Sequence, residues 1–193
     1  MSGPLLIVGL GNPGPKYAET RHNAGFWFLD RVLQRFGGDL RAQSKLKAET
    51  ARTVIEGRDC VLARPASFMN ESGLPVRSVL DYFRIPAADL LVAYDELDLP
   101  PGIVRLKQGG GHGGHNGMRD IFRHVPDHEF LRFRIGIGHP GSKDRVTGYV
   151  LGRPGADDER SIRDAIDRAV DVLPEIVAGR IAPAMKALHT AAD

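Results

Sequence analysis

The histidine at position 22 is the side chain in this sequence best suited to acid–base chemistry. It lies in Thr20-Arg21-His22-Asn23, which the residue pattern places at or just before the first turn of the first long helix. Imidazole takes up a proton near neutral pH, a helix N-terminus disfavours its charged form, and a nearby carboxylate would restore its basicity. A lone histidine is usually a solvated or capping residue, but the expected position of His22 near strand ends favours a general base.

Three apolar runs that read as buried strands are each followed by a polar side chain. The runs and the polar residues after them are Leu5 to Val8 with Asn12, Cys60 to Ala63 with Asn70, and Leu90 to Tyr94 with Asp95. Open α/β sheets bind ligands at the carboxyl ends of their strands, so we expect these three groups to share a site. Asp95-Glu96-Leu97-Asp98 would otherwise serve only as a turn, or hold a cation, although a hard-cation site usually draws on a broader set of oxygen atoms.

A glycine-rich loop, Gly109 to Gly117, opens a short helix later in the chain. Its glycines let the backbone approach a ligand or move as a gate, and they leave the amide of Asn116 free to donate and accept hydrogen bonds. His112 and His115 are candidate zinc ligands, but no cysteine lies nearby and the loop is flexible. We therefore interpret the segment as a substrate loop and expect no metal.

A second glycine pattern, Gly9 to Gly14, matches the dinucleotide fingerprint G-x-G-x-x-G. In that fingerprint the helix begins inside the glycines, whereas Pro13 and Pro15 delay it here until about residue 21. The acidic residue expected at the end of a second strand is also missing, because Asp30 falls inside a helix. A tight turn is therefore the preferred interpretation, and we expect no cofactor.

The elements that would position these groups follow from apolar periodicity and turn residues. The expected strands are residues 5–8, the hairpin 47–55 and 59–64 around Glu56-Gly57-Arg58, and residues 90–94, 103–107 and 131–135. The expected helices are residues 25–36, one marked by Val76, Val79, Leu80 and Phe83 and ended by Pro86, residues 116–124, and a last long helix over 157–178. Helices between apolar strands indicate an α/β three-layer sandwich, and the hairpin makes its twisted sheet mixed but mostly parallel.

The composition is typical of one globular domain over residues 1–193. A mass of 21.1 kDa with 42% apolar residues allows a sizeable core. No run approaches the roughly 18 apolar residues of a membrane span, and the N-terminus has neither a basic region nor a cleavage site, so we expect a cytoplasmic protein. The only cysteine, Cys60, lies in an apolar run, where a structural role is expected over a nucleophilic one.

Basic residues are concentrated in the middle of the chain. Residues 101–153 hold nine basic and four acidic side chains, whereas residues 1–100 hold twelve of each. This local excess suits an anionic partner that approaches one region, although solvated surface charge would also explain it.

Several sequence blocks recur together in a known family. They are Val8 to Gly14 with Tyr17, Thr20 to Gly25, Phe68 to Gly73, Asp95 to Pro100, Gly109 to Gly117, and Arg134 to Pro140. By these blocks, which run nearly end to end in the right order, the chain resembles the bacterial peptidyl-tRNA hydrolases. The resemblance implies a metal-independent esterase that cleaves the bond between a peptide and the 3′ end of tRNA, with tRNA as its partner and a monomer as its state.

The resemblance also implies roles for single positions. His22 would be the general base, Asp95 the group that stabilises its active form, and Asn12 a further member of the catalytic set. Those that would contact the peptide or the terminal nucleotide are Asn12, Asn70, Asn116, Tyr17, Phe68, Met69 and His115. Those that would clamp tRNA phosphate are Arg105, Lys107 and Arg134, with Arg105 in a place where some relatives have lysine.

In the implied mechanism, neutral His22 removes a proton from water while Asp95 orients the ring, and the water attacks the ester carbonyl. Asn12 or Asn116 would donate hydrogen bonds to the oxyanion. Asn12 would also recognise a peptide amide and so spare aminoacyl-tRNA with a free amine. The alternatives are a non-catalytic RNA-binding relative, which the intact His22 and Asp95 argue against, and a nucleotide-dependent oxidoreductase built on the first glycine turn.

Overall fold

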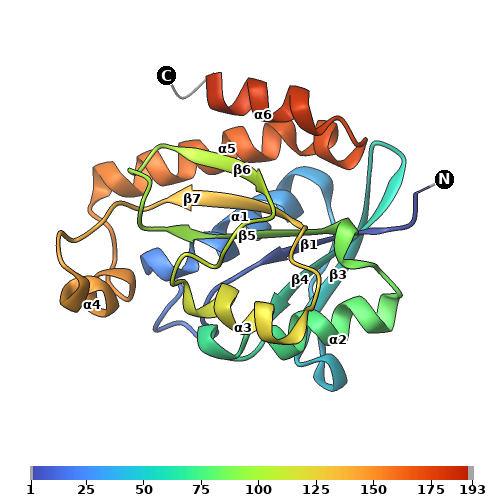
Figure 1. Ribbon diagram of the computed structural model, residues 1–193, viewed down its shortest axis with the longest axis horizontal. Helices are drawn as coiled ribbons and strands as arrows, with labels where there is room; N and C mark the ends of the chain where they lie inside the picture. Colours follow the sequence, from blue (N-terminus) through green and yellow to red (C-terminus); the bar gives the residue numbers. More distant parts are fainter. Residues whose placement is uncertain (1, 191–193) are drawn as a thin grey trace.

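Residues 2–190 are described by a computed structural model, in which seven strands form one mixed sheet (Figure 1). The strands are β1 (Leu5–Gly9), β2 (Arg41–Gln43), β3 (Ala48–Ile55), β4 (Arg58–Pro65), β5 (Leu90–Glu96), β6 (Val104–Gln108) and β7 (Leu131–Gly136), in the order β2-β3-β4-β1-β5-β7-β6. The central strands β4, β1, β5 and β7 are parallel, whereas β3 and β6 run antiparallel to their neighbours. The expected mixed, mostly parallel sheet is confirmed.

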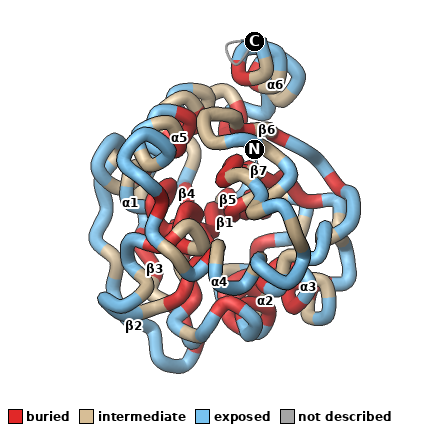
Figure 2. Tube along the Cα trace, turned by 90° about the vertical axis from the view of Figure 1, so that its left-hand side faces the viewer, coloured by how far each residue is buried: buried red, intermediate tan, exposed pale blue. Residues whose placement is uncertain are grey.

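Helices cover both faces of this sheet. They are α1 (Ala24–Phe36), α2 (Gly73–Phe83), α3 (Asn116–His124), α4 (Val146–Val150), α5 (Ala156–Val177) and α6 (Ile181–Thr190). In Figure 1, α1, α5 and α6 lie on one side of the sheet, and α2 and α3 lie on the other side. Each face has its own apolar core, so the chain forms the expected three-layer sandwich, and the central strands are the most buried part of the trace in Figure 2.

Two glycines explain why the start of α1 lies directly on the end of β1. A Cβ on Gly9 would come within 2.2 Å of the carbonyl oxygen of Gly25, and a Cβ on Gly25 within 2.4 Å of that of Ala93. Only glycine permits this approach. The side-chain amide of Asn23 then bonds both backbone polar groups of Asn12. Its Oδ1 accepts the N–H of Asn12 at 2.8 Å, and its Nδ2 donates to the carbonyl oxygen at 3.0 Å, so the residues before α1 are fixed beside the strand end.

Three elements differ from the sequence expectation. The short β2 and α4 were not expected, because three and five residues are too few for a clear periodicity. The helix α6 also follows the one expected to be last, and it packs on α5 and β6 after a turn at Gly179. The second helix ends at Phe83 and Arg84 adopts a left-handed conformation with φ of 54°, so the helix stops before Pro86.

Cys60 lies in the core under α1, as its apolar surroundings predicted. Burial raises the pKa of its thiol to about 11, so the thiolate needed for nucleophilic chemistry is absent near neutral pH. Among the helices of residues 2–190, none combines the length and apolar character that a membrane crossing requires.

Candidate active site

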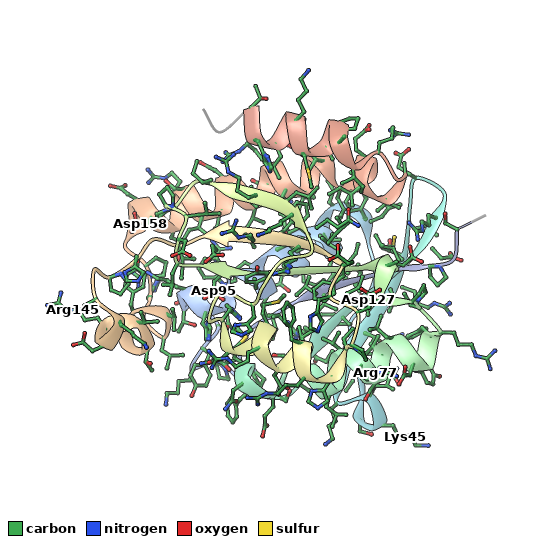
Figure 3. All side chains as sticks on the ribbon, in the orientation of Figure 1. Lys45, Arg77, Asp95, Asp127, Arg145 and Asp158 are labelled. Atoms are coloured by element: carbon green, nitrogen blue, oxygen red, sulfur yellow. The ribbon has the colours of Figure 1, made fainter. Side chains whose placement is uncertain are left out.

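A cavity of about 260 Å³ opens at the carboxyl ends of the parallel strands. Asn12 follows β1, Asp95 lies near the end of β5, and Asn70 follows β4, as the apolar runs before them predicted. His22 enters from the 3₁₀ turn before α1, and the glycine-rich loop contributes His115 and its neighbours. Figure 3 shows Asp95 at this end of the sheet, with α3 and α4 beside it.

Asp95 holds two histidines at once. Its Oδ2 lies 2.8 Å from Nδ1 of His22, and its Oδ1 lies 2.8 Å from Nε2 of His115. The Asp95 side chain is only 2% exposed, whereas that of His22 is 12% exposed and reaches the cavity. The carboxylate therefore has both oxygen atoms engaged, and solvent reaches the histidine ring but not the acid.

Hydrogen bonds assign the ring protons of both histidines. Nδ1 of His115 accepts the backbone N–H of Met118 at 3.2 Å, so its Nε2 carries the proton and donates to Asp95. Nδ1 of His22 likewise donates to the other carboxylate oxygen. In neutral His22 this leaves Nε2 with a free lone pair, and that atom has no protein partner among residues 2–190.

The charges of this cluster tune each other. Burial lowers the pKa of His22, but the charge and the hydrogen bond of Asp95 together raise it by more than burial lowers it. The pKa of His22 therefore lies above its usual value of 6.5. Burial would raise the pKa of Asp95, yet the charges and hydrogen bonds of His22 and His115 hold it well below its usual range. The aspartate is thus ionised throughout the neutral range, and it makes the histidine a stronger base.

Asn12 presents a hydrogen-bond donor to the cavity. Its Oδ1 accepts the backbone N–H of Met69 at 2.7 Å, which assigns the orientation of the amide. Its Nδ2 has no partner in the described part of the chain and is free to donate. This arrangement suits an oxyanion better than the peptide N–H that the sequence interpretation assigned to Asn12, because the acceptor atom is already occupied.

The other expected contact residues divide into two groups. Met69, Asn70 and Asn116 line the cavity, and Oδ1 of Asn116 accepts a hydrogen bond from Arg119 at 3.3 Å. Tyr17 and Phe68 do not line it; they form an edge-to-face pair with ring centroids 6.0 Å apart. Phe68 is 54% exposed, so the pair joins two loops near the cavity and leaves an aromatic face open to solvent.

The three expected phosphate ligands lie outside the cavity, on β6 and β7. Arg105 and Arg134 are cross-strand partners, so their side chains share one face of the sheet with Lys107. Arg134 is not a free cation, since its Nε bonds Glu96 at 2.9 Å. Arg105 and Lys107 make no ion pair within residues 2–190, which leaves their charges available.

Several lining residues escaped the sequence interpretation. Glu96 and Leu97 line the cavity directly after Asp95, and the segment Val146 to Leu151 forms another wall. Glu96 and Leu97 belong to the acidic segment after Asp95, so their place in the sequence could have predicted that they line the cavity. No sequence feature predicted the α4 segment, because its short mixture of polar and apolar residues has no period.

Within residues 2–190, a metal site would have to use His22, Asp95 and His115, whose ligand atoms lie within 4.8 Å of one another. His112 takes no part, because its Nδ1 accepts the N–H of Gly114 and its ring contacts Phe122. The two nitrogen–oxygen distances of 2.8 Å are those of hydrogen bonds, and Nε2 of His115 carries a proton where a ligand needs a lone pair. The donor set therefore fits a metal ion poorly.

The first glycine turn departs from the dinucleotide-binding fingerprint. After Gly14 the chain makes turns, and α1 begins only at Ala24. The helix therefore does not begin inside the glycines, as the two prolines predicted, although the first turn of α1 later packs on Gly9.

The fold and cavity define an α/β protein in which a buried carboxylate holds a solvent-accessible histidine ready to act as a base beside an amide donor. The model of the family described as "Peptidyl-tRNA hydrolase" matches residues 6–193. Curated peptidyl-tRNA hydrolases of Halorhodospira halophila and Xanthomonas campestris are 52% and 53% identical over 184 and 190 residues, which is 95% and 98% of both chains. The crystal structure of peptidyl-tRNA hydrolase from Acinetobacter baumannii is 47% identical with a TM-score of 0.94, over 97% of this chain and 95% of that one.

The chain therefore belongs to the peptidyl-tRNA hydrolase family.

Proposed function

We propose that this enzyme hydrolyses the ester between a peptide and the 3′-terminal ribose of tRNA, with His22 as the general base. Family membership supports the reaction, and the hydrogen bond between His22 and Asp95 carries the assignment of the base. The products are a free peptide and a tRNA with an intact 3′ hydroxyl, so the reaction returns tRNA from prematurely released peptidyl-tRNA to use.

The proton moves between water and one nitrogen atom. Nε2 of neutral His22 removes a proton from water as the oxygen attacks the ester carbonyl, and Asp95 stabilises the imidazolium that forms. The Nδ2 donor of Asn12 bonds the oxyanion, and Asn116 offers a second amide on the opposite wall. Collapse of the tetrahedral intermediate releases the ribose oxygen, which takes the proton from His22.

Several further properties belong to the proposal. Arg105 and Lys107 contact tRNA phosphate, and Glu96 holds Arg134 in place beside them. These contacts give an affinity for tRNA that decreases as the salt concentration rises and that does not depend on the nucleotide sequence. Tyr17 and Phe68 offer aromatic faces to the terminal nucleotide. We further propose one domain over residues 1–193, a monomer, and action in the cytoplasm, where tRNA is used.

One assay tests the reaction directly. The protein is incubated with N-acetyl-aminoacyl-tRNA and with unblocked aminoacyl-tRNA in the presence of a chelator. We expect rapid loss of the blocked ester alone, and no effect of the chelator, because the donor set of His22, Asp95 and His115 fits a metal ion poorly. Loss of activity with chelator would reject the metal-independent mechanism, and equal loss of both esters would reject the specificity for peptides.

The activity is expected to fall on the acid side of a pKa above 6.5. Only neutral His22 accepts a proton, and Asp95 raises its pKa, so the acid limb is displaced to higher pH. Below that pKa, kcat/KM for N-acetyl-aminoacyl-tRNA should drop about tenfold for each pH unit. The measurement subtracts spontaneous ester hydrolysis at each pH, and a limb centred at or below 6.5 would contradict the tuning by Asp95.

Asn12→Asp is expected to lower kcat about 10²- to 10³-fold on N-acetyl-aminoacyl-tRNA, with a small change in KM. The carboxylate keeps the acceptor for the Met69 N–H but loses the donor and repels the oxyanion. Its charge would also attract a free α-amine, so the preference for blocked over unblocked substrate should narrow. Asn116→Asp is the matched control, and a larger loss of kcat there would move the oxyanion role to Asn116.

A further inference from the structure

A second cavity, of about 430 Å³, shares Asn12 with the active site. Its walls come from the turn after β1, from α1, and from β2, β3 and β4. The end of β4 and the loop after it line both cavities, with Pro65 and Ala66 in the second and Met69 and Asn70 in the first. Its size is within the range of natural ligand pockets, so it is large enough for part of a substrate held at Asn12.

The charged side chains that line this second cavity are mainly acidic. Pro13, Pro15 and Pro65, which also line it, have no backbone N–H group to donate. Asp30 and Glu49 add two carboxylates against the single cation of Arg64. A ligand with N–H or ammonium donors matches such a lining, and phosphate oxygens do not.

The carboxylates are only partly neutralised. Arg64 bonds Glu49, lies over the ring of Phe26 at 5.4 Å, and reaches Asp30 only at 3.8 Å. Asp30 has no other ion pair within residues 2–190, and its side chain is 53% exposed at the rim, where the charge of Arg163 also acts on it. The charged residues that line the second cavity, two carboxylates and one arginine, sum to one negative charge that an incoming cation can meet.

The sheet separates this cavity from the cations of β6 and β7. In Figure 2, which looks onto the edge near α4, β2 and β3 lie on one side of β1 and β5, and β6 lies on the other. At about 4.8 Å between strands, β3 is about 10 Å from β1. A substrate held by its phosphates at β6 and by its ester at Asn12 thus points its acyl part toward β3, and an extended peptide covers 10 Å in about three residues.

We propose that the second cavity binds the peptide upstream of the ester-linked residue and prefers a lysine or arginine side chain there. This rests on the proposed function, because it assumes that the ester is cleaved at His22. Apolar groups of Phe26 and Trp27 line the cavity and suit the stem of such a side chain, and the rim carboxylates suit its charge.

The test compares three substrates on one enzyme preparation: N-acetyl-Lys-Lys-Ala-tRNA, N-acetyl-Glu-Glu-Ala-tRNA and N-acetyl-Ala-tRNA. We expect kcat/KM to be about five- to tenfold higher for the lysine than for the glutamate substrate, as attraction and repulsion at a half-exposed site both contribute. Asp30→Asn with Glu49→Gln should reduce that ratio to about twofold or less, and Arg64→Met should increase it. A ratio between substrates does not depend on the fraction of enzyme that is folded.

The controls separate this proposal from the function on which it depends. Asp127→Asn removes one negative charge far from Asp95 in Figure 3 and should leave the ratio unchanged. Failure to hydrolyse N-acetyl-Ala-tRNA would reject the proposed function itself. With that activity intact, an equal rate on both longer substrates would overturn the peptide site, and so would a double variant that slows all three substrates equally, as expected if the cavity holds the terminal nucleotide.

Discussion

His22→Ala is expected to lower kcat/KM for N-acetyl-aminoacyl-tRNA by about 10³-fold or more, while the affinity for tRNA changes by less than about twofold. The variant removes the only nitrogen in the Asp95 cluster that can accept a proton. Both ring nitrogens of His115 are occupied, one by the N–H of Met118 and one by Asp95, so His115 cannot replace the lost base. Cations on β6 that lie outside the cavity remain in place.

The measurement combines single-turnover hydrolysis with binding of uncharged tRNA. His128→Ala is the matched control, because this histidine stacks on Phe122 and does not line the cavity. It should retain activity within about twofold. Near wild-type hydrolysis by the His22 variant would reject His22 as the base, and loss of tRNA binding would show that the substitution damaged more than the proton transfer.

Asp95→Asn is expected to lower kcat about 10²- to 10⁴-fold. This loss is larger than removal of the negative charge alone would cause, because the new amide also selects the inactive tautomer of His22. Nε2 of His115 must donate, since its Nδ1 accepts the N–H of Met118. The oxygen of the new amide therefore turns toward His115, and its NH₂ turns toward Nδ1 of His22. His22 then carries its proton on Nε2, where the lone pair is needed.

A double variant distinguishes this explanation from simple loss of charge. Adding His115→Ala to Asp95→Asn releases the amide, which can turn its oxygen toward His22 and restore the active tautomer. We expect the double variant to hydrolyse N-acetyl-aminoacyl-tRNA at least as fast as Asp95→Asn alone. If the rate losses caused by Asp95→Asn and by His115→Ala simply add in the double variant, the tautomer argument is contradicted, provided that circular dichroism shows that the variant proteins are folded.

The order of elements was predictable because it follows from local patterns. Alternating or continuous apolar runs predicted β1, β5 and β7, and helical spacing predicted α1 and α5, within a few residues of their bounds. The elements that were not expected, β2, α4 and α6, are short or lie beyond the last strong pattern. Two of them owe their position to packing on neighbouring elements, such as α6 on α5, which no local pattern records.

The residues of the site divide in the same way. The sequence by itself determined which groups stand at the carboxyl ends of parallel strands, and therefore that Asn12, Asn70 and Asp95 meet, because strand direction and the turn after each strand are local properties. It also determined that no helix begins inside the first glycine turn, because two prolines delay the helix until Ala24.

Only the tertiary structure decided how these groups are charged and protonated. His22 and Asp95 are 73 positions apart, and the bond of His115 to the same carboxylate depends on how the glycine-rich loop packs. The ion pair of Arg134 with Glu96 and the second cavity beside Asn12 likewise depend on contacts between distant segments. Hydrogen-bond direction and burial are set by such contacts at the scale of an ångström, and the local residue pattern does not specify them.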